Sequence, residues 1–498
     1  MRTPFVDRHT ELAFLQRVLA NRQHPGPGQF VILYGRRRIG KSALLRTWAE
    51  QSGVPFTYWV AEKEPAPVQR RKLFARITNT DPSGLGPAFA SWADLWQAVA
   101  PIFQAQRRIL VLDEIPYAAD ADPAMLSALQ HAWDQHFEHS QAMIVICGSH
   151  VRTMELMVAH QSPLFGRLTG QWRLHPLPFG TLRAFVPSWS SEQQVALYAM
   201  VGGVPTYLSW FRAERTLPEN VRDGILAPGS LALGEVLFLL YDELREPRAY
   251  LSILEAIGNG HHTFKAIKDA TLIGDVHLPS YLAMLQEMRY VERRLPVTIP
   301  PAKQRLSRQG RYHLSDPFFR FYFRFIHPHR DVINDTPERI VPALQSGLRA
   351  FVGQTAWEEL SRQWVRTQGA MGALPFVPEA VGSHWSRTVQ VDVVAVNWQT
   401  HTILLGECKW GADAVSRDVV RELITQKAPR VLVDLPGGAS AWTVVYALFT
   451  RAGLTEAAAQ ELATQHGIHV DLPQLYADLA EGLDELGGSS GSVLPPER

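Results

Sequence analysis

Residues 35–42 combine glycine, lysine and a hydroxyl group at a spacing that binds phosphate. They read GRRRIGKS, which matches the pattern G-x-x-x-x-G-K-[ST] of phosphate-binding loops. In such loops the glycines let backbone N–H groups face phosphate oxygens, the lysine bridges the β- and γ-phosphates, and the hydroxyl holds Mg²⁺. The residues expected to bind nucleotide here are Gly35, Arg38, Gly40, Lys41, Ser42 and Ala43.

Two adjacent carboxylates, Asp113 and Glu114, follow a continuous apolar run at residues 109–112. Runs of this kind are typical of strands buried in a parallel sheet, and the residues at their carboxyl ends reach the ligand crevice. Asp113 would complete the Mg²⁺ shell and Glu114 would polarise the attacking water, the Walker B arrangement. Together with the phosphate loop, these carboxylates predict an ATPase or GTPase.

A third group of charged residues lies at 388–409, which reads TVQVDVVAVNWQTHTILLGECK. The pattern predicts a hairpin with Asp392 on one strand and Glu407 and Lys409 on the same side of the next, because residues two apart share a face. Two carboxylates and an ammonium can hold Mg²⁺ and activate water for phosphodiester cleavage. An upstream helix that contains residues 356–360, with Glu358 and Glu359, could add a carboxylate. A surface hairpin with an ordinary salt pair stays open on spacing alone, although the strands are notably apolar.

The elements that must position these groups alternate between strands and helices. Apolar runs predict strands at 30–34, 56–60, 108–112 and 142–149, and helical spacing predicts helices at 91–105 and 124–138. All-apolar strands separated by helices predict a doubly wound parallel sheet. A further helix is expected within residues 5–20, with Asp7 or Thr10 as its N-cap.

The 498 residues are enough for about two to four domains. We expect an α/β multidomain protein divided into a phosphate-loop core at 1–190, a helical lid at 191–245, a winged-helix-like domain at 246–330, an α/β restriction-endonuclease-like domain at 331–480 and a disordered tail at 481–498. The winged helix rests on helices at 248–257, 263–270 and 279–289 and a hairpin of 290–295 with 311–314; a generic helical lid stays open. The aromatic run at 318–325 is expected to be a core helix.

Composition limits the possible partners. The net charge is +1, so any DNA-binding surface must be a local patch. Two cysteines allow neither a disulfide framework nor a zinc cluster. The sequence predicts no signal peptide and no membrane span, and this favours a cytoplasmic protein without a membrane partner. A local excess of basic residues could contact DNA or form a solvated face; its members are Lys265, Lys268, Arg289, Arg293, Arg294, Arg305, Arg308 and Arg311.

With these groups placed, the chain resembles a prokaryotic ATPase family first noted in archaea, in the STAND-like branch near AAA+ proteins. The matching stretches are FVDRHTEL at 5–12, LDEIPY at 112–117, GSH at 148–150, SPLFGRLTG at 162–170 and YAMVGGVPTYL at 198–208. The resemblance implies ATP rather than GTP, Ser149 as a sensor, Arg167 as a γ-phosphate-sensing arginine and Pro205 near the adenine.

The C-terminal third resembles a domain fused to such ATPases, a relative of PD-(D/E)xK nucleases of the Holliday-junction-resolvase type. Glu358 falls on the helix carboxylate of that motif, Asp392 on the strand aspartate, and Glu407 and Lys409 on the E-x-K pair. Glu359 beside Glu358 leaves the helix assignment open by one position, and Val391 stands where the motif has proline.

The resemblance implies an ATP-hydrolysing, DNA-associated protein whose nuclease-like site uses Mg²⁺, or Mn²⁺, held by Asp392 and Glu407. DNA would bind through residues 265–311 and the C-terminal domain, and the chain could form a homo-oligomer. The alternative is a signalling or scaffold ATPase whose nuclease fold is inactive.

Overall fold

The structure is a computed structural model that describes residues 5–21, 28–80, 87–244, 246–333 and 340–486. It contains two compact units: Met1–Leu177 with Val204–Thr206, and Pro178–Gly203 with Tyr207–Arg498. The main stretch of the first unit ends at Leu177, and Val204–Thr206 rejoins it. The finer division into lid, winged helix and C-terminal domain stays a prediction.

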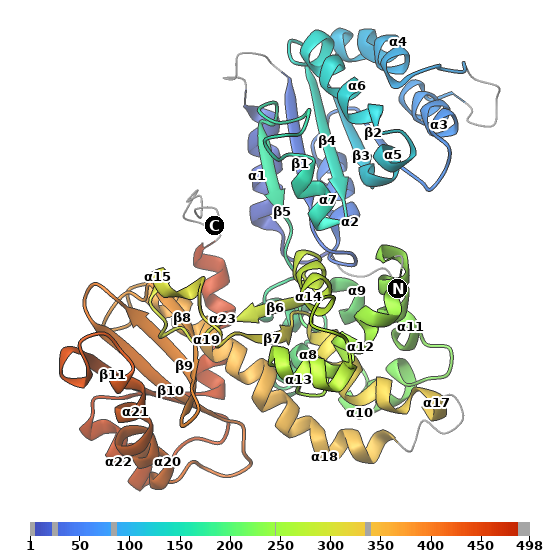
Figure 1. The fold of residues 1–498 in the computed structure, drawn as a ribbon. Coiled ribbons are helices and arrows are strands. Elements are labelled where there is room, and N and C mark those ends of the chain that lie inside the picture. The colour runs from blue at the N-terminus through green and yellow to red at the C-terminus, as the bar shows by residue number, and fades with distance from the viewer. Residues whose placement is uncertain (1–4, 22–27, 81–86, 245, 334–339, 487–498) are drawn as a thin grey trace. The chain divides into compact units, whose positions relative to one another are not determined.

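The first unit is built on a five-stranded sheet with the order β2-β3-β4-β1-β5 (Figure 1). All neighbouring strands are parallel, which confirms the predicted parallel sheet. Its strands are β1 (Gln29–Tyr34), β2 (Phe56–Val60), β3 (Arg108–Asp113), β4 (Ala142–Gly148) and β5 (Gly170–Arg173). The short strand β5 was not predicted, because only four residues pair and none of them is fully buried.

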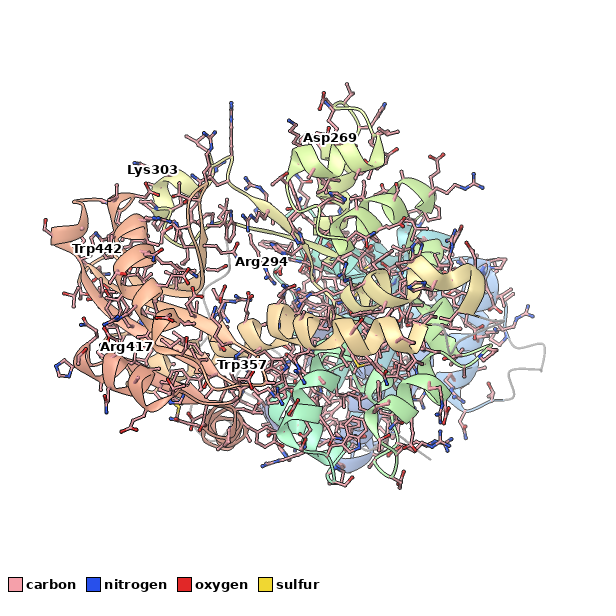
Figure 2. All side chains as sticks on the ribbon, turned by 90° about the horizontal axis from the view of Figure 1, so that it is seen from below. Asp269, Arg294, Lys303, Trp357, Arg417 and Trp442 are labelled. Atoms are coloured by element: carbon pink, nitrogen blue, oxygen red, sulfur yellow. The ribbon has the colours of Figure 1, made fainter. Side chains whose placement is uncertain are left out.

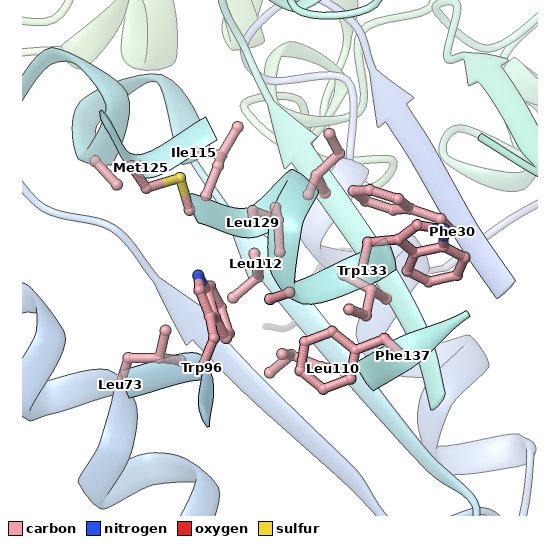
Figure 3. Packing of buried hydrophobic residues seen from close by; sticks show 14 of the residues in the cluster. Phe30, Leu73, Trp96, Leu110, Leu112, Ile115, Met125, Leu129, Trp133 and Phe137 are labelled. Atoms are coloured by element: carbon pink, nitrogen blue, oxygen red, sulfur yellow. The ribbon is translucent and has the colours of Figure 1, made fainter. Parts of the chain in front are cut away.

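Helices cover both faces of this sheet. One face packs on α1 (His9–Ala20) and α2 (Lys41–Gln51). The other face packs on α3 (Ala66–Thr78), α4 (Trp92–Ala105), α5 (Ile115–Ala121), α6 (Ala124–Ala132) with the π-helical turn η1 (Trp133–Phe137), and α7 (Val151–Leu156). Figure 3 shows part of this second core, in which the Trp133 ring lies 5.0 Å from that of Phe30 at the start of β1.

The N-cap of α1 differs from the prediction. The helix begins at His9 after Arg8, which adopts a left-handed conformation with φ of 74° and caps no N–H with its side chain. Neither Asp7 nor Thr10 is the N-cap. The physical reason is tertiary, because the Arg8 guanidinium donates to the carbonyl oxygen of Ile39 at 3.0 Å and its backbone follows that contact.

The second unit begins with helical segments and continues into a helix–hairpin region. Its N-terminal helical elements are η2 (Phe179–Ala184), α8 (Ser191–Val201), α9 (Pro205–Leu208, whose first two residues belong to the first unit), α10 (Leu217–Asn220), η3 (Val221–Ile225) and α11 (Leu231–Glu243). Next come α12 (Pro247–Gly258), α13 (Phe264–Thr271), α14 (Leu278–Glu287), β6 (Val291–Arg294), α15 (Pro301–Gln304) and β7 (Arg311–Leu314). Strands β6 and β7 pair antiparallel, as predicted.

The aromatic run is buried as expected. It forms α16 (Pro317–Phe321) and the π-helical turn η4 (Tyr322–Ile326), in which every Phe and the Tyr are at most 5% exposed. The chain then passes through η5 (His327–His329) and α17 (Arg330–Ile333) to α18 (Ile340–Val352), η7 (Gly353–Trp357) and α19 (Glu358–Ala370).

A second five-stranded sheet follows, with the order β12-β11-β10-β9-β8. Its strands are β8 (Ala380–Trp385), β9 (Gln390–Asn397), β10 (Thr402–Lys409), β11 (Thr443–Thr450) and β12 (Ile468–Asp471). Strands β8, β9 and β10 pair antiparallel, which confirms the predicted hairpin, whereas β10, β11 and β12 are parallel.

Helical elements connect and flank these strands. They are α20 (Arg417–Glu422), η8 (Leu423–Lys427), α21 (Ala428–Val433), η9 (Ala439–Ala441), α22 (Glu456–Thr464) and α23 (Leu472–Leu486). Because α23 continues to Leu486, the expectation of a disordered tail from residue 481 is wrong for 481–486, and residues 487–498 lie outside the described part. Among the described residues, no helix combines the length and apolar character needed to cross a membrane.

Candidate functional site

The phosphate loop connects the end of β1 to the start of α2. Gly40 caps α2 in a left-handed conformation with φ of 92°, which L side chains rarely adopt. At Gly35 a Cβ atom would stand 2.5 Å from the carbonyl oxygen of Leu174, too close for any other residue. Both glycines of the motif are therefore required by the backbone path.

Lys41 lies inside this loop and is only 6% exposed. Its Nζ donates to the carbonyl oxygens of Gly35 and Arg36, each at 2.9 Å. Burial lowers the pKa of Lys41, and the nearby Glu114 and Asp113 oppose that shift. The ammonium is thus held in the loop by weak neutral acceptors, which phosphate oxygens can replace.

Asp113, at the end of β3, accepts two short hydrogen bonds at one carboxylate oxygen. Ser42 Oγ donates to Oδ2 at 2.7 Å and the Tyr58 hydroxyl donates to the same atom at 2.5 Å. Burial, together with the Asp113 carboxylate, raises the pKa of Tyr58, so it remains a donor. Adjacent hydroxyl and carboxylate oxygens are the ligands that Mg²⁺ takes in phosphate-loop proteins, so Ser42 and Asp113 fit that ion.

Glu114 adopts a left-handed conformation with φ of 51°, a strained position for a residue with a side chain. Its Oε2 accepts from Ser149 Oγ at 2.9 Å and from the Ser149 backbone N–H at 3.2 Å. Ser149 follows the end of β4, next to β3 in the sheet. The structure therefore brings the predicted sensor serine onto the predicted water-polarising glutamate.

Residues 204–206 return to the phosphate loop from beyond the main part of the first unit. Pro205 Cγ lies 3.8 Å from where a Cβ on Gly40 would stand, and Thr206 Oγ1 donates to the Arg38 carbonyl oxygen at 3.2 Å. The predicted Pro205 thus lies beside the loop. The contact of Arg38 with Thr206 is made by the Arg38 backbone carbonyl oxygen.

Arg167 does not join this group. Its guanidinium makes two 2.8 Å hydrogen bonds to the carboxylate of Asp134, which lies in η1. Two residues later, the Thr169 N–H donates to the carbonyl oxygen of Phe30 at the start of β1. Arg167 therefore lies at the amino edge of the sheet, opposite the phosphate loop, and this placement corrects the expectation that it senses the γ-phosphate bound to its own chain.

In the C-terminal domain, Glu407 on β10 is 2% exposed and is held by two lysines. Lys409 Nζ lies 3.0 Å from Oε2, and Lys427 Nζ in η8 lies 2.7 Å from Oε1. The first contact joins two predicted site residues. Lys427 was missed, and its position 20 residues downstream carries no sequence signal for this contact.

Asp392 on β9 and Glu358 at the start of α19 lie near each other. Asp392 Oδ2 accepts from the Cys408 N–H at 3.1 Å, and burial followed by repulsion from Glu407 raises the pKa of Asp392. Burial raises the pKa of Glu358 to about 7, and repulsion from the Asp392 carboxylate is the second cause of the shift. Arg362 connects the two elements, because its Nη1 donates to Glu358 Oε2 at 3.2 Å and to the Asp392 carbonyl oxygen at 3.0 Å.

These contacts decide between the two adjacent glutamates of α19. Glu358 faces Asp392, whereas Glu359 forms an ion pair with Arg320 of α16 at 2.9 Å. Arg362 was missed by sequence reasoning, although its position one helical turn after Glu358 could have indicated the pair.

The described residues contain no group of three or more His, Cys, Asp or Glu side chains arranged to hold a metal ion. Mg²⁺ in phosphate-processing sites usually keeps several waters and is bound by one or two carboxylates. Asp392 and Glu407 provide such a pair, and the raised pKa of Asp392 beside Glu407 shows a repulsion that a divalent cation would relieve. The residues thus fit a hydrated ion and not one caged by protein ligands.

The basic residues predicted to contact DNA are spread over several elements. Lys265 and Lys268 lie on α13, Arg289 follows α14, and Arg305 and Arg308 lie between the two hairpin strands. Lys268 forms an ion pair with Asp275 at 2.6 Å. Arg293 and Arg294 lie on β6 and Arg311 on β7. Only Arg294, Arg308 and Arg311 of this set line cavities described below.

Comparison with known proteins matches two families to the chain. A family described as an ATPase domain predominantly from Archaea matches residues 5–211, which confirms the predicted ATPase domain. A family of archaeal and bacterial proteins of unknown function matches residues 322–422. The uncharacterised protein MJECL04 of Methanocaldococcus jannaschii is 30% identical over 416 residues, covering 83% of this chain and 89% of the relative.

Comparison with solved structures gives partial matches. The Walker-type ATPase of Pyrococcus abyssi has a TM-score of 0.46 and 20% identity, covering 65% of this chain and 97% of that chain. The ORC2 protein of Aeropyrum pernix, solved in ADPNP and ADP complexes, has a TM-score of 0.46 and 16% identity, covering 68% of this chain and 95% of that chain.

Proposed function

Because the chain belongs to the same family as the Methanocaldococcus jannaschii protein and contains an ATPase domain of the archaeal type, we propose that it hydrolyses ATP to control a DNA-processing site. The observation that carries the first half is the pair of contacts at the sheet's carboxyl edge. Ser42 meets Asp113 at 2.7 Å, and Ser149 meets Glu114 at 2.9 Å. These contacts support Ser42 and Asp113 as cation ligands and Glu114 as the water-polarising base.

Hydrolysis would proceed through small movements of these residues. Lys41 exchanges the carbonyl oxygens of Gly35 and Arg36 for phosphate oxygens, and Ser42 turns its hydroxyl from Asp113 toward the cation site. When bound, Mg²⁺ neutralises charge on the β- and γ-phosphates. Glu114 accepts a proton from a water that attacks the γ-phosphorus while the bond to the bridging oxygen breaks. Glu114 must release Ser149 to do this, which links hydrolysis to the end of β4.

The second half of the proposal concerns the C-terminal domain. Helix α19, the antiparallel strands β8–β10 and the parallel strand β11 support a nuclease fold of the PD-(D/E)xK type. Asp392 and Glu407 would hold Mg²⁺, which activates water and stabilises the leaving oxygen. Lys409 would place its ammonium on the phosphate, and Glu358, with a pKa of about 7, would exchange a proton near neutral pH. Mn²⁺ would substitute for Mg²⁺ there.

Further parts of the proposal concern the regions between these sites. Residues 191–245 would act as a lid, Pro205 would contact the adenine, and residues 246–330 would act as a winged helix on DNA. Helices α12, α13 and α14 with the β6–β7 hairpin support the last assignment. We also propose that the chain forms a homo-oligomer.

One observation favours a second function, a signalling or scaffold ATPase whose nuclease fold is inactive. Both oxygens of Glu407 are already neutralised, one by Lys409 and the other by Lys427. If these ion pairs persist when DNA is present, Glu407 cannot bind a metal ion, and the domain would serve only for binding.

The test incubates the full chain with Mg²⁺ or Mn²⁺, with and without ATP, and with labelled linear, single-stranded and branched DNA. Asp392→Ala should abolish cleavage and Lys41→Ala should remove both ATP hydrolysis and any ATP dependence of cleavage. Asp413→Ala, an exposed carboxylate of the same domain, is the matched control and should behave as wild type. ATP hydrolysis without cleavage of any DNA would reject the nuclease and leave the scaffold function.

A further inference from the structure

Two adjoining cavities lie between the β6–β7 hairpin and the C-terminal sheet of the second unit. The inner one has a volume of about 510 Å³ and the outer one about 760 Å³. They share Arg311 and Trp385 as lining residues, so they form one groove. Its inner end reaches Glu358 and Arg362 of the nuclease-like site.

Hydrogen bonds between the two walls fix the width of this groove. The Val297 N–H donates to the carbonyl oxygen of Ser383 at 3.0 Å. The indole N–H of Trp385 donates to the carbonyl oxygen of Gln309 at 2.9 Å. A buried contact of 2.7 Å joins Thr298 Oγ1 to His384 Nδ1. The groove is therefore built by the packing of the hairpin on β8.

Arginines dominate the lining. They are Arg294, Arg311, Arg320, Arg324 and Arg362 in the inner cavity and Arg308, Arg311 and Arg387 in the outer one. The carboxylates that line the two cavities are Glu358 and Asp434. Figure 2 shows Arg294 at the space between the hairpin and the C-terminal domain.

Several of these guanidinium groups lack an anionic partner. Arg320 pairs with Glu359, Arg362 with Glu358, and Arg294 with Glu292. Within the described residues, Arg308, Arg311, Arg324 and Arg387 form no ion pair with a carboxylate. Burial lowers the pKa of Arg311, which is the cost of desolvating a cation that an anion in the groove would offset.

Aromatic rings also line the groove, although only 7% of Trp385 is exposed. The Trp385 ring lies at the junction of the two cavities, with the Arg311 guanidinium 4.9 Å from its centroid. Deeper inside, the rings of His262 and His313 stack at 4.4 Å. Burial lowers the pKa of His313 to about 2 and also lowers the pKa of His262, so the positive charge available to phosphates comes chiefly from the arginines.

The dimensions select a single strand. Cavities of about 300–1,000 Å³ bury a ligand of drug size, which is closer to one or two nucleotides than to a segment of duplex. Sites for single strands combine a basic groove with aromatic rings on which bases stack. Charge and shape both match a polynucleotide strand.

We propose that this arginine groove, the surface lined by Arg308, Arg387, Arg311, Trp385 and Arg294, binds one strand of DNA and leads a phosphate toward Glu358 and Asp392. This inference rests on the proposed action on DNA and adds the kind of DNA, its route and the residues that hold it. Phosphates entering past Arg308 and Arg387 would follow Arg311 inward, with a base stacked on Trp385.

The test measures binding of the full chain to a fluorescein-labelled oligothymidylate of roughly 20 nucleotides, several times a typical site length. Fluorescence anisotropy in EDTA keeps any cleavage from interfering. The same measurement is made with a duplex and with oligouridylate RNA of equal length. Arg308→Gln combined with Arg387→Gln removes two exposed charges, and Arg417→Gln combined with Arg421→Gln on α20 is the charge-matched control, distant from Arg294 in Figure 2.

We expect the single strand to bind more tightly than the duplex or the RNA. The Arg308/Arg387 variant should weaken binding about 10- to 100-fold and lower the slope of log affinity against log salt by about 1 to 2, since each lost phosphate contact removes a released counterion. Trp385→Ala should weaken binding roughly 5- to 100-fold, and Trp385→Phe should retain much of it. The control pair should leave binding unchanged, and circular dichroism melting checks folding of each variant.

Any one of three results would contradict the proposal that the groove binds single-stranded DNA. They are unchanged single-strand binding in the Arg308/Arg387 and Trp385 variants, tighter binding of the duplex, or tighter binding of the RNA. Absence of binding to any DNA would reject both the groove and the proposed action on DNA. Loss of single-strand binding in the variants, together with absent cleavage in wild type, would support the groove while rejecting the nuclease.

Discussion

The two sites hold their carboxylates with different kinds of group. In the first unit, hydroxyl groups hold the carboxylates by hydrogen bonds: Asp113 accepts from Ser42 and Tyr58, and Glu114 accepts from Ser149. In the C-terminal domain cations do so, because Glu407 lies between two lysines and Glu358 pairs with an arginine.

This difference has a chemical consequence. A neutral hydroxyl can rotate away and leave a carboxylate free to bind a cation, at the cost of one ordinary hydrogen bond. A carboxylate between two ammonium groups is already neutralised, and a metal ion must displace one of them. The ATPase site is therefore set for its cation, whereas a cation at Glu407 would first have to displace a lysine.

The largest expected effect comes from Lys41→Ala, which tests whether the first site works as a phosphate loop. The loss of the ammonium that stabilises developing phosphate charge should lower kcat for ATP hydrolysis roughly 100- to 1,000-fold. A malachite-green phosphate assay measures it, with Lys72→Ala as the control, because Lys72 is a partly exposed lysine of α3 that pairs with Glu62 and Glu64. A reduction of less than a few fold would remove Lys41 from the mechanism.

The next effect concerns Lys427, which distinguishes the second site from the first. Lys427→Met leaves one oxygen of the buried Glu407 without its cation, so the free energy of unfolding should fall by about 1 to 3 kcal/mol. In the same variant Mg²⁺ should raise the melting temperature more than it does in wild type, because the ion no longer competes with the lysine. Differential scanning fluorimetry with and without Mg²⁺ measures both. Equal Mg²⁺ shifts in the two proteins would contradict the competition.

Sequence reasoning succeeded where one segment decides the structure. The phosphate loop, the strand before Asp113 and the hairpin of β9 with β10 are local patterns of glycine spacing and apolar runs, and the structure has all three. The Asp392–Glu407–Lys409 group follows from the hairpin because cross-strand partners and residues two apart are fixed by pairing.

What failed depends on contacts between distant segments. The N-cap of α1 is set by the Arg8 bond to Ile39, 31 residues away, and Arg167 was carried over from a motif that contains no information on which sheet edge it reaches. Lys427 approaches Glu407 only because η8 packs against β10. No spacing rule in one sequence encodes these placements.

A smaller effect is expected from pH, through Glu358. Its pKa is about 7 in the folded chain against an ordinary value of 4.5, so the folded state binds a proton that the unfolded state has lost between these pH values. The contribution of this group to stability is therefore complete below about pH 4.5 and is lost as pH rises through 7. Glu358→Gln should reduce the loss of stability between pH 5 and pH 7 by roughly 2 kcal/mol, at about 1.4 kcal/mol per unit.

Melting temperatures at pH 5 and pH 7 test the Glu358 effect. Glu422→Gln is the control, because it removes an exposed carboxylate of the same domain. If both variants keep the wild-type difference between the two pH values, Glu358 ionises normally and the second site is less desolvated than its contacts indicate.

The smallest effect is expected from Tyr58→Phe, which removes one of the two hydroxyls on Asp113 and keeps the aromatic ring. Ser42 still donates to the same oxygen, so the free energy of unfolding should change by only about 1 kcal/mol and ATP hydrolysis by a few fold. Because the lost donor also competes with the cation for Asp113, the concentration of Mg²⁺ needed for half-maximal hydrolysis should fall. An increase in that concentration would mean that Tyr58 orients Asp113 for the metal ion. The carboxylates of the first site would then depend on their hydrogen-bond donors as much as Glu407 depends on its lysines.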